Sequence, residues 1–299
     1  MGKILFGLFY GFTWLLARLP MVITHGLADI SFIILYYIVR YRRKVVRKNL
    51  TNSFPNKSLL EIKKIERKFY RHLSDLFYES FYLLHASTER AVKRCKFNNP
   101  EIFHKLYAEG KSAILVSGHY GNWEMYAQIG NKVKHASLGV YKPLTNKYFE
   151  VLMNNARKRF GGIPVPMVDT LRAIIDCKQK GKPFLLGLVS DQTPPSNQIQ
   201  YWTHFLNQDT AVYLGIEKIA QKFDLPIYYC SMQKIKRGKY EIDFELLTDS
   251  PKSFDQYELT KLHTKRLEKQ IQEKPEYWLW SHKRWKRKRK PETNPSTAS

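Results

Sequence analysis

The feature that most constrains the fold is an apolar run, Ala113 to Val116, that leads directly into the segment SGHYGNWE at residues 117–124. Such a run is typical of a buried strand, and the glycines beside His119 allow the chain to turn sharply where the strand ends. Ligands of open α/β sheets bind outside the carboxyl ends of the strands. The sequence therefore predicts a central strand that brings His119 to the ligand-binding edge of a sheet.

Strand and helix patterns alternate along the rest of the chain, which predicts an α/β fold with a sheet flanked by helices. At 299 residues the chain is long enough for one large core. Further strands are predicted at 136–141, 184–190, 226–232 and 240–247. Helices are predicted at 58–86, 122–133, 147–160, 169–180, 211–223 and 254–272.

His119 and Glu124 have the spacing of a catalytic pair. Asn122 is a good N-cap residue, so Glu124 should fall in the first turn of a helix that begins there. A carboxylate in that position could reach one imidazole nitrogen and fix the tautomer, which leaves the other nitrogen free to accept a proton. We therefore expect a pair that activates a hydroxyl. The alternative is a histidine with a purely structural role at a strand end.

Other His–acid pairs with the same spacing lack a preceding strand. Two lie in patterns typical of solvated helix faces, and one lies in a polar loop that we expect to face substrate or to be structural. The helical pairs are His104 with Glu109 and His263 with Glu268, and the loop pair is His204 with Asp209.

The N-terminal segment 1–39 is predicted to be a membrane anchor. Residues 4–17 contain no charge, and a second apolar stretch ends at Val39 and is interrupted only by His25 and Asp29. Each stretch alone is marginal for a membrane span, which needs about 20 apolar residues. Together they could form one anchoring helix or a shallow hairpin. The alternative is a buried helix pair of a soluble protein.

The net charge of +24 requires an acidic partner. Because its basic clusters adjoin apolar or aromatic sequence, we expect anionic membrane lipid, with about 1 kcal/mol of attraction per basic residue. For residues 287–290 a merely solvated charge run is an equal alternative. The clusters are Arg40, Arg42, Arg43, Lys44, Arg47 and Lys48, and Lys283, Arg284, Lys286, Arg287, Lys288, Arg289 and Lys290.

The positive charge after Val39 predicts that the following domain faces the cytoplasm. No helix-turn-helix, zinc-finger or RNA-binding signature is present, so we expect no nucleic-acid partner. The three cysteines show neither a disulfide framework nor zinc-ligand spacing, and we expect no metal and no cofactor. The predicted organisation is an anchor at 1–39, a folded domain at 40–290 and a disordered tail at 291–299.

An ordered set of motifs extends over most of the chain: YRRKVVRKNLTNSFPN at 41–56, SGHYGNWE, YKPLTN at 141–146, SDQTPP at 190–195 and PEYWLWSHKRWK at 275–286. This set resembles the late acyltransferases of lipid A and lipopolysaccharide biosynthesis, the lauroyl/myristoyl acyltransferases of the lysophospholipid acyltransferase superfamily. The resemblance implies a glycerol-3-phosphate acyltransferase-like fold with a central mixed sheet.

The resemblance also implies an activity. A fatty acyl chain would pass from a thioester, carried by acyl carrier protein or coenzyme A, to a hydroxyl of a lipid A precursor at the bacterial inner membrane. His119 would be the general base and Glu124 its orienting carboxylate. Two alternatives stay open: the same chemistry on another lipid or a pigment precursor, and a non-catalytic basic protein that binds membranes.

Further site residues follow from the resemblance. In the family, the acidic and amide residues that match Asp191 and Gln192 lie close to the catalytic centre, which implies the same place for this pair. The alternative is that Asp191 only forms a loop. Lys142 stands where relatives often have arginine, and it could contact the thioester oxygen or a phosphate. Arg157 is an equal candidate for that contact or a helix-surface residue.

The proposed reaction also needs donors for the oxyanion, and we expect the backbone amides of Gly121 and Asn122 to supply them. Trp278, Trp280 and Trp285 could form an interfacial anchor or pack on the core.

Overall fold

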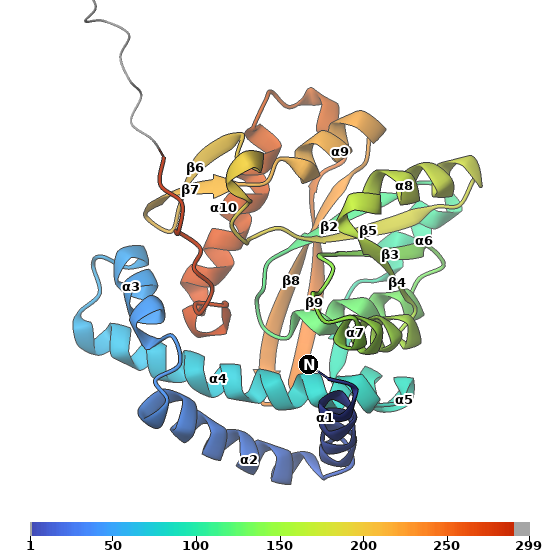
Figure 1. Cartoon of the computed structure of the whole chain (residues 1–299). Coiled ribbons are helices and arrows are strands. Elements are labelled where there is room, and N and C mark those ends of the chain that lie inside the picture. The colour runs from blue at the N-terminus through green and yellow to red at the C-terminus, as the bar shows by residue number, and fades with distance from the viewer. Residues whose placement is uncertain (1, 290–299) are drawn as a thin grey trace, which may run out of the picture.

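A computed structural model describes residues 2–289, which form a seven-stranded mixed sheet flanked by helices (Figure 1), so the predicted fold class is confirmed. The strand order is β1-β9-β8-β2-β5-β3-β4. The strands are β1 Cys95–Phe97, β2 Ala113–Ser117, β3 Ala136–Tyr141, β4 Gly162–Pro166, β5 Phe184–Val189, β8 Ile227–Lys236 and β9 Lys239–Thr248. A separate hairpin consists of β6 Tyr201–Phe205 and β7 Gln208–Val212.

The middle of the sheet is parallel. Strand β2 is fully buried and pairs in parallel with β5 on one side and β8 on the other. Strand β9 pairs antiparallel with β8 and parallel with β1. Because β2 and β5 run side by side in the same direction, the segments that follow them emerge at the same sheet edge.

The helices alternate with the strands, and those at residues 43–53 and 88–92, like strand β1, are not among the predicted elements. The helices are α1 Lys3–Leu16, α2 Met21–Ile33, α3 Arg43–Ser53, α4 Leu59–His85, α5 Thr88–Val92, α6 Glu101–Ala108, α7 Lys147–Arg159, α8 Thr170–Gln179, α9 Gly215–Phe223 and α10 Glu258–Glu273. The helix predicted at 122–133 is instead a 3₁₀-helix, η2, at Trp123–Asn131. The prediction that Asn122 caps it through its side chain is wrong, because no such hydrogen bond forms there.

Two further differences arise from local chemistry. The edge strand β4 contains Pro164 and Pro166, which hide its strand pattern, and proline is tolerated in strands mainly at sheet edges. The loop predicted around His204 and Asp209 is the β6–β7 hairpin, in which these two residues are cross-strand partners. Because β7 extends to Val212, helix α9 begins later than the predicted residue 211.

The longest helix, α4, supports the N-terminal segment. It begins with a capping box between Ser58 and Glu61 and buries an apolar face that includes Ile62 and Phe69. On its outer side, away from the sheet, lie α1 and α2 (Figure 1). Helix α2 continues as a π-helix, η1 Ile34–Ile38. The stretch Met21–Ile38 is the one helix, among the described residues, that is long and apolar enough to cross a membrane.

The two basic clusters meet in space although they are far apart in sequence. Arg42 Nη1 donates to the Ser281 carbonyl at 3.1 Å, and Asn49 Nδ2 donates to the carbonyls of Trp280 and His282. Helix α3 therefore lies against the C-terminal segment 275–289. Arg284 is only 2% exposed, so its predicted place in the surface cluster is wrong. Lys290 and the predicted tail 291–299 lie outside the described residues.

Candidate active site

The site begins where β2 ends, and two glycines shape that turn. Gly121 has a φ of +60°, which non-glycine residues rarely adopt, and a Cβ there would lie 2.6 Å from Met232 Sδ. At Gly118, a Cβ would lie 2.7 Å from Leu267 Cδ1 and 3.1 Å from Asp191 Oδ2. The close approach at Gly118 is what allows Asp191 to reach the backbone of His119.

Asp191, which follows β5, receives the imidazole of His119. The distance between His119 Nδ1 and Asp191 Oδ1 is 2.6 Å, and the backbone N–H of His119 donates to Oδ2 at 2.9 Å. The indole N–H of Trp278 donates to the same Oδ2 at 2.7 Å. These contacts fix the carboxylate from three directions, and its side chain is only 3% exposed.

The other imidazole nitrogen faces Gln192. Its Nε2 lies 3.1 Å from His119 Nε2. Because the carboxylate of Asp191 can only accept, the proton of neutral His119 lies on Nδ1, and Nε2 accepts from the amide. The nitrogen that accepts a hydrogen bond is therefore the one that points away from Asp191. That tautomer suits a general base.

The pair shifts the acidity of both groups. Burial alone would lower the pKa of His119, but the charge of Asp191, their hydrogen bond and the charge of Glu124 outweigh it, so the pKa is raised. Burial alone would raise the pKa of Asp191, whereas the charge and hydrogen bonds of His119 and the bond from Trp278 bring it down to about 2. Asp191 is therefore ionised at neutral pH.

The prediction that Glu124 orients the imidazole is wrong. Glu124, in the first turn of η2, forms a bidentate ion pair with Arg157 of α7, in which Nη2 lies 3.0 Å from both carboxylate oxygens. The Nε of Arg157 also donates to Glu124 Oε2 at 3.1 Å. Glu124 influences His119 through its charge. The carboxylate that touches the imidazole is that of Asp191.

The backbone amides expected to stabilise an oxyanion have other partners. The N–H of Gly121 donates to the Tyr277 carbonyl at 3.0 Å, and the N–H of Asn122 donates to Met232 Sδ at 3.1 Å. The prediction that these amides face the reacting carbonyl is therefore wrong. The Asn122 side chain is buried and donates to Glu79 Oε2 at 3.0 Å, so it anchors the loop to α4.

An apolar cavity of about 120 Å³ opens beside this loop. Its walls are formed by η2 and by strands of the sheet, and the Glu124–Arg157 pair belongs to its lining. Apolar lining residues include Leu115, Ile129, Leu138, Leu188 and Phe244. Lys142, which follows β3, is exposed and is not among the residues that line the cavity. Arg157 is thus the better placed of the two predicted cations.

The C-terminal segment completes the site through contacts that the sequence did not predict. Tyr120 and Trp278 form an isolated antiparallel bridge, and the Leu279 N–H donates to the His119 carbonyl at 3.1 Å. Trp278 and Trp280 are buried in the main hydrophobic core. They are core residues and not an interfacial anchor. The alternation of aromatic and basic residues in PEYWLWSHKRWK marks this segment in the sequence. It does not show that one of its tryptophans contacts Asp191.

One other histidine differs from its predicted environment. His263 was expected on a solvated helix face, but it is buried on the inner face of α10, and burial lowers its pKa to about 4. Its predicted partner Glu268 accepts a hydrogen bond from the backbone of Leu206. Within residues 2–289, no group of three or more His, Cys, Asp or Glu side chains could hold a metal ion.

Comparison with known proteins identifies relatives over nearly the whole chain. The family model described as bacterial lipid A biosynthesis acyltransferase matches residues 2–287. A lipid A biosynthesis lauroyltransferase of Escherichia coli is 24% identical, over 96% of this chain and 92% of that protein. A lipid A biosynthesis palmitoleoyltransferase of Escherichia coli is 21% identical, over 94% and 90% of the two chains.

Among solved structures, the 1-acyl-sn-glycerophosphate acyltransferase of Thermotoga maritima matches with 16% identity and a TM-score of 0.38, over 87% of this chain and 100% of that chain. That agreement is too loose to support an argument.

Proposed function

This chain belongs to the bacterial lipid A biosynthesis acyltransferase family, and we propose that it moves a fatty acyl chain from an acyl thioester to a hydroxyl of a lipid A precursor. One observation carries the proposal: the His119–Asp191 pair stands at the end of β2, and an apolar cavity is lined by Ser117 of that strand and by Trp123, whose ring centroid lies 5.0 Å from that of the His119 imidazole. The family supports acyl transfer, and a histidine–carboxylate pair close to an apolar space is what a base acting on a fatty acyl group would need.

In the proposed reaction, Asp191 holds the His119 proton on Nδ1, so that Nε2 takes the proton of the acceptor hydroxyl. That hydroxyl would replace the amide of Gln192, which lies 3.1 Å from Nε2. The hydroxyl oxygen attacks the thioester carbonyl and the C–S bond breaks. The proton on Nε2 then passes to the leaving thiolate. Asp191 stabilises the imidazolium that exists between these two transfers.

A cation is proposed to stabilise the oxyanion. Arg157 is favoured over Lys142 because it lines the cavity and because Glu124 holds its planar guanidinium in place. A well-placed donor of this kind contributes about 3 kcal/mol to the transition state in comparable sites. Glu124 then acts on the reaction through Arg157, as a positioning residue.

The donor is proposed to be acyl carrier protein, and coenzyme A thioesters share its reactive end. An acidic carrier suits the face on which α3 meets the C-terminal segment. Its exposed basic residues include Arg40, Arg42, Lys44, Lys48, Lys283, Lys286, Arg287 and Lys288. The same face could rest on anionic lipid, so we place the protein at the bacterial inner membrane with its catalytic domain in the cytoplasm.

The experiment is mass spectrometry of membrane lipids from cells that lack the protein and cells that carry it. The intact protein should add the mass of one acyl chain to lipid A, and the His119→Ala variant should add none. The matched control is His204→Ala, because His204 is exposed on β6 and has an acid at the same spacing. Acyl addition by the His119→Ala variant, or acylation confined to another lipid class, would overturn the proposal.

A further inference from the structure

We propose that α1 and α2 lie in the plane of one membrane leaflet, docked on α4, and that α2 does not cross the bilayer. The proposal rests on the membrane location put forward above and adds the mode of attachment. By length and hydropathy alone, the helix formed by α2 and η1 at Met21–Ile38 could span a membrane. The polar contacts of α2, its exposed face and the charges at its ends favour the in-plane arrangement.

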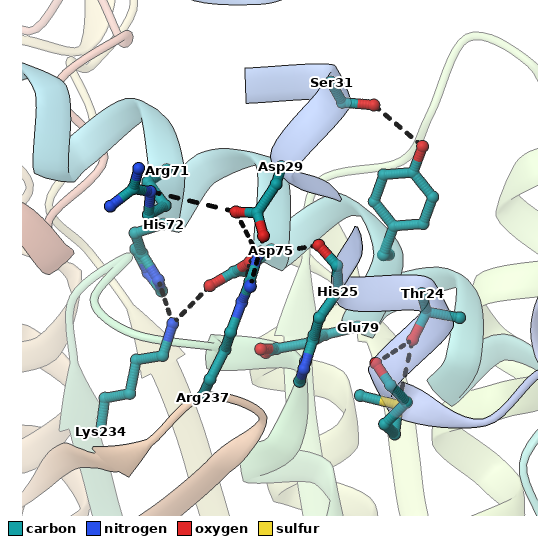
Figure 2. A network of polar contacts seen from close by, with 12 residues as sticks. Thr24, His25, Asp29, Ser31, Arg71, His72, Asp75, Glu79, Lys234 and Arg237 are labelled. Atoms are coloured by element: carbon teal, nitrogen blue, oxygen red, sulfur yellow. Dashed lines mark hydrogen bonds and ion pairs between the residues drawn. The ribbon is translucent and has the colours of Figure 1, made fainter. Parts of the chain in front are cut away.

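An ion-pair network ties α2 to the catalytic domain (Figure 2). Arg237, from the turn between β8 and β9, forms two hydrogen bonds of 2.9 Å with the carboxylate of Asp29 on α2. It also donates to the His25 carbonyl at 3.0 Å and, through Nε, to Asp75 of α4 at 2.8 Å. One guanidinium therefore joins α2, α4 and the sheet.

The network continues inward and would be broken if α2 left α4. Asp75 also binds Lys234 at 3.0 Å, and both side chains are almost fully buried. Losing α2 would remove one carboxylate from Arg237 and leave Asp29 in hydrocarbon without its partner. An ionised group in that position is strongly disfavoured. Docked on α4, Asp29 keeps its partner.

The docking extends along both helices. Near the C-terminal end of α2, Ser31 Oγ lies 2.9 Å from the hydroxyl of Tyr78. On α1, Thr13 Oγ1 lies 2.9 Å from His85 Nε2, at the other end of α4. Between the helices, Arg90 donates to the Ala17 carbonyl at 3.1 Å. Helix α2 is therefore held along α4 rather than projecting from it, as Figure 1 shows.

The opposite face of the pair is apolar and exposed. Helix α2 buries Thr24, Ala28 and Phe32 against the domain, and both helices turn large apolar side chains outward, a pattern typical of helices that lie in a membrane interface. The exposed side chains are Ile4, Leu5, Leu8, Phe12 and Leu15 on α1, and Val22, Ile23, Ile30, Ile33, Ile34 and Ile38 on α2 and η1.

Charge at both ends of α2 identifies the occupant as an anionic lipid surface. Arg18, in the turn before α2, stacks over the Trp14 ring, with 3.2 Å between its Cζ and the ring centroid. Arg40, Arg42 and Lys44 follow η1 and are exposed. A crossing helix would place these two groups on opposite sides of the membrane. In-plane helices place both at the headgroups of a single leaflet.

Cysteine labelling of the full chain tests this directly. The native cysteines are all buried, so a Lys3→Cys variant presents a single exposed thiol, with Lys57→Cys as the control on the catalytic domain. A membrane-impermeant maleimide is applied to intact spheroplasts and to inside-out vesicles. In-plane helices predict that both variants are labelled in inside-out vesicles only. Labelling of Lys3→Cys in spheroplasts would overturn the proposal.

A double-mutant cycle between Asp29→Asn and Arg237→Gln gives a second readout. Docking predicts that each variant lowers the melting temperature of the detergent-solubilised protein, and that the double variant falls by clearly less than the sum. Additive changes would show that α2 does not depend on Arg237 and would contradict the docked arrangement.

The experiments distinguish an error in the proposed membrane location from an error in the proposed in-plane arrangement of α1 and α2. Recovery of the whole protein in the soluble fraction, without detergent, would refute the membrane location itself. A membrane-bound protein whose position 3 is labelled from outside would refute only the in-plane arrangement.

Discussion

The imidazole of His119 and the carboxylate of Asp191 lie 2.6 Å apart although the residues are separated by 72 positions in the chain. They meet because β2 and β5 are parallel neighbours, and each residue stands just past the end of its strand. The acid that serves His119 thus comes from the adjacent strand of the sheet, not from the helix that follows His119.

Replacing Trp278 by Phe removes one hydrogen bond from the Asp191 carboxylate and keeps most of the buried ring. A hydrogen bond to a charged group contributes about 1.5–3 kcal/mol, so the free energy of unfolding should fall by that order. The carboxylate also becomes more basic, which raises the pKa of His119. Because the reaction needs neutral His119, the acid limb of the kcat/KM profile should move to higher pH.

Trp280→Phe is the matched control for Trp278→Phe. Trp280 is equally buried, and its indole N–H donates to the Pro275 carbonyl instead. This variant should lose stability and leave the position of the acid limb unchanged. Equal pH shifts in the two variants would show that Trp278 acts only through packing.

The ion pair of Glu124 and Arg157 should behave as a unit. Glu124→Gln and Arg157→Met should each slow acyl transfer, and the double variant should be little slower than either one. We expect a coupling of about 1–3 kcal/mol in the activation free energy for groups in direct contact. Independent, additive effects on kcat/KM would mean that Glu124 does not act through Arg157.

The His119–Asp191 pair predicts a particular dependence of stability on pH. Because the pKa of His119 is raised on folding, its stabilising contribution is complete below pH 6.5 and is lost as the pH rises through the folded value. The gap in melting temperature between the wild type and His119→Gln should therefore be larger at pH 6 than at pH 9. A gap that grows with pH would contradict the sign of this shift.

The contribution of Asp191 has the opposite sign. Its pKa falls on folding from 3.8 to about 2, so its contribution is complete above 3.8 and is lost as the pH drops towards 2. Between pH 6 and 9 its ionisation is constant. Any change in that window therefore reports on His119.

The turn after His119 should not tolerate a side chain at Gly121. Gly110 is a control with a similar positive φ, +68°, but with open space around its Cα. Gly110→Ala should cost about 1–2 kcal/mol of unfolding free energy from backbone strain alone. Gly121→Ala should cost more, because its Cβ meets Met232, and it should also slow turnover. Similar losses in both variants would indicate that Met232 moves aside freely.

Much of the fold could be predicted from periodicity, because β2, β3, β5, β8 and β9 are continuous apolar or alternating runs. Strand β4 was missed because its prolines break the pattern, and the β6–β7 hairpin because polar residues such as His204, Asn207 and Asp209 interrupt its apolar ones.

The sequence pattern identified the catalytic base, His119, but not the carboxylate that contacts it. The spacing of His119 and Glu124 is visible in the sequence, whereas the side-by-side placement of β2 and β5, which selects Asp191, is a property of the folded sheet. The contact from Trp278 depends in the same way on how the C-terminal segment closes over the loop.

The most direct test of the central claim is the turnover number of the purified, full-length Asp191→Asn variant with an acyl thioester and a lipid A precursor. The amide has the shape of the carboxylate but cannot hold the imidazole in the required tautomer, so kcat should fall on the order of 10³-fold or more. Asp209→Asn, on the exposed hairpin, should retain wild-type turnover. Near-normal turnover by the Asp191→Asn variant would contradict the account.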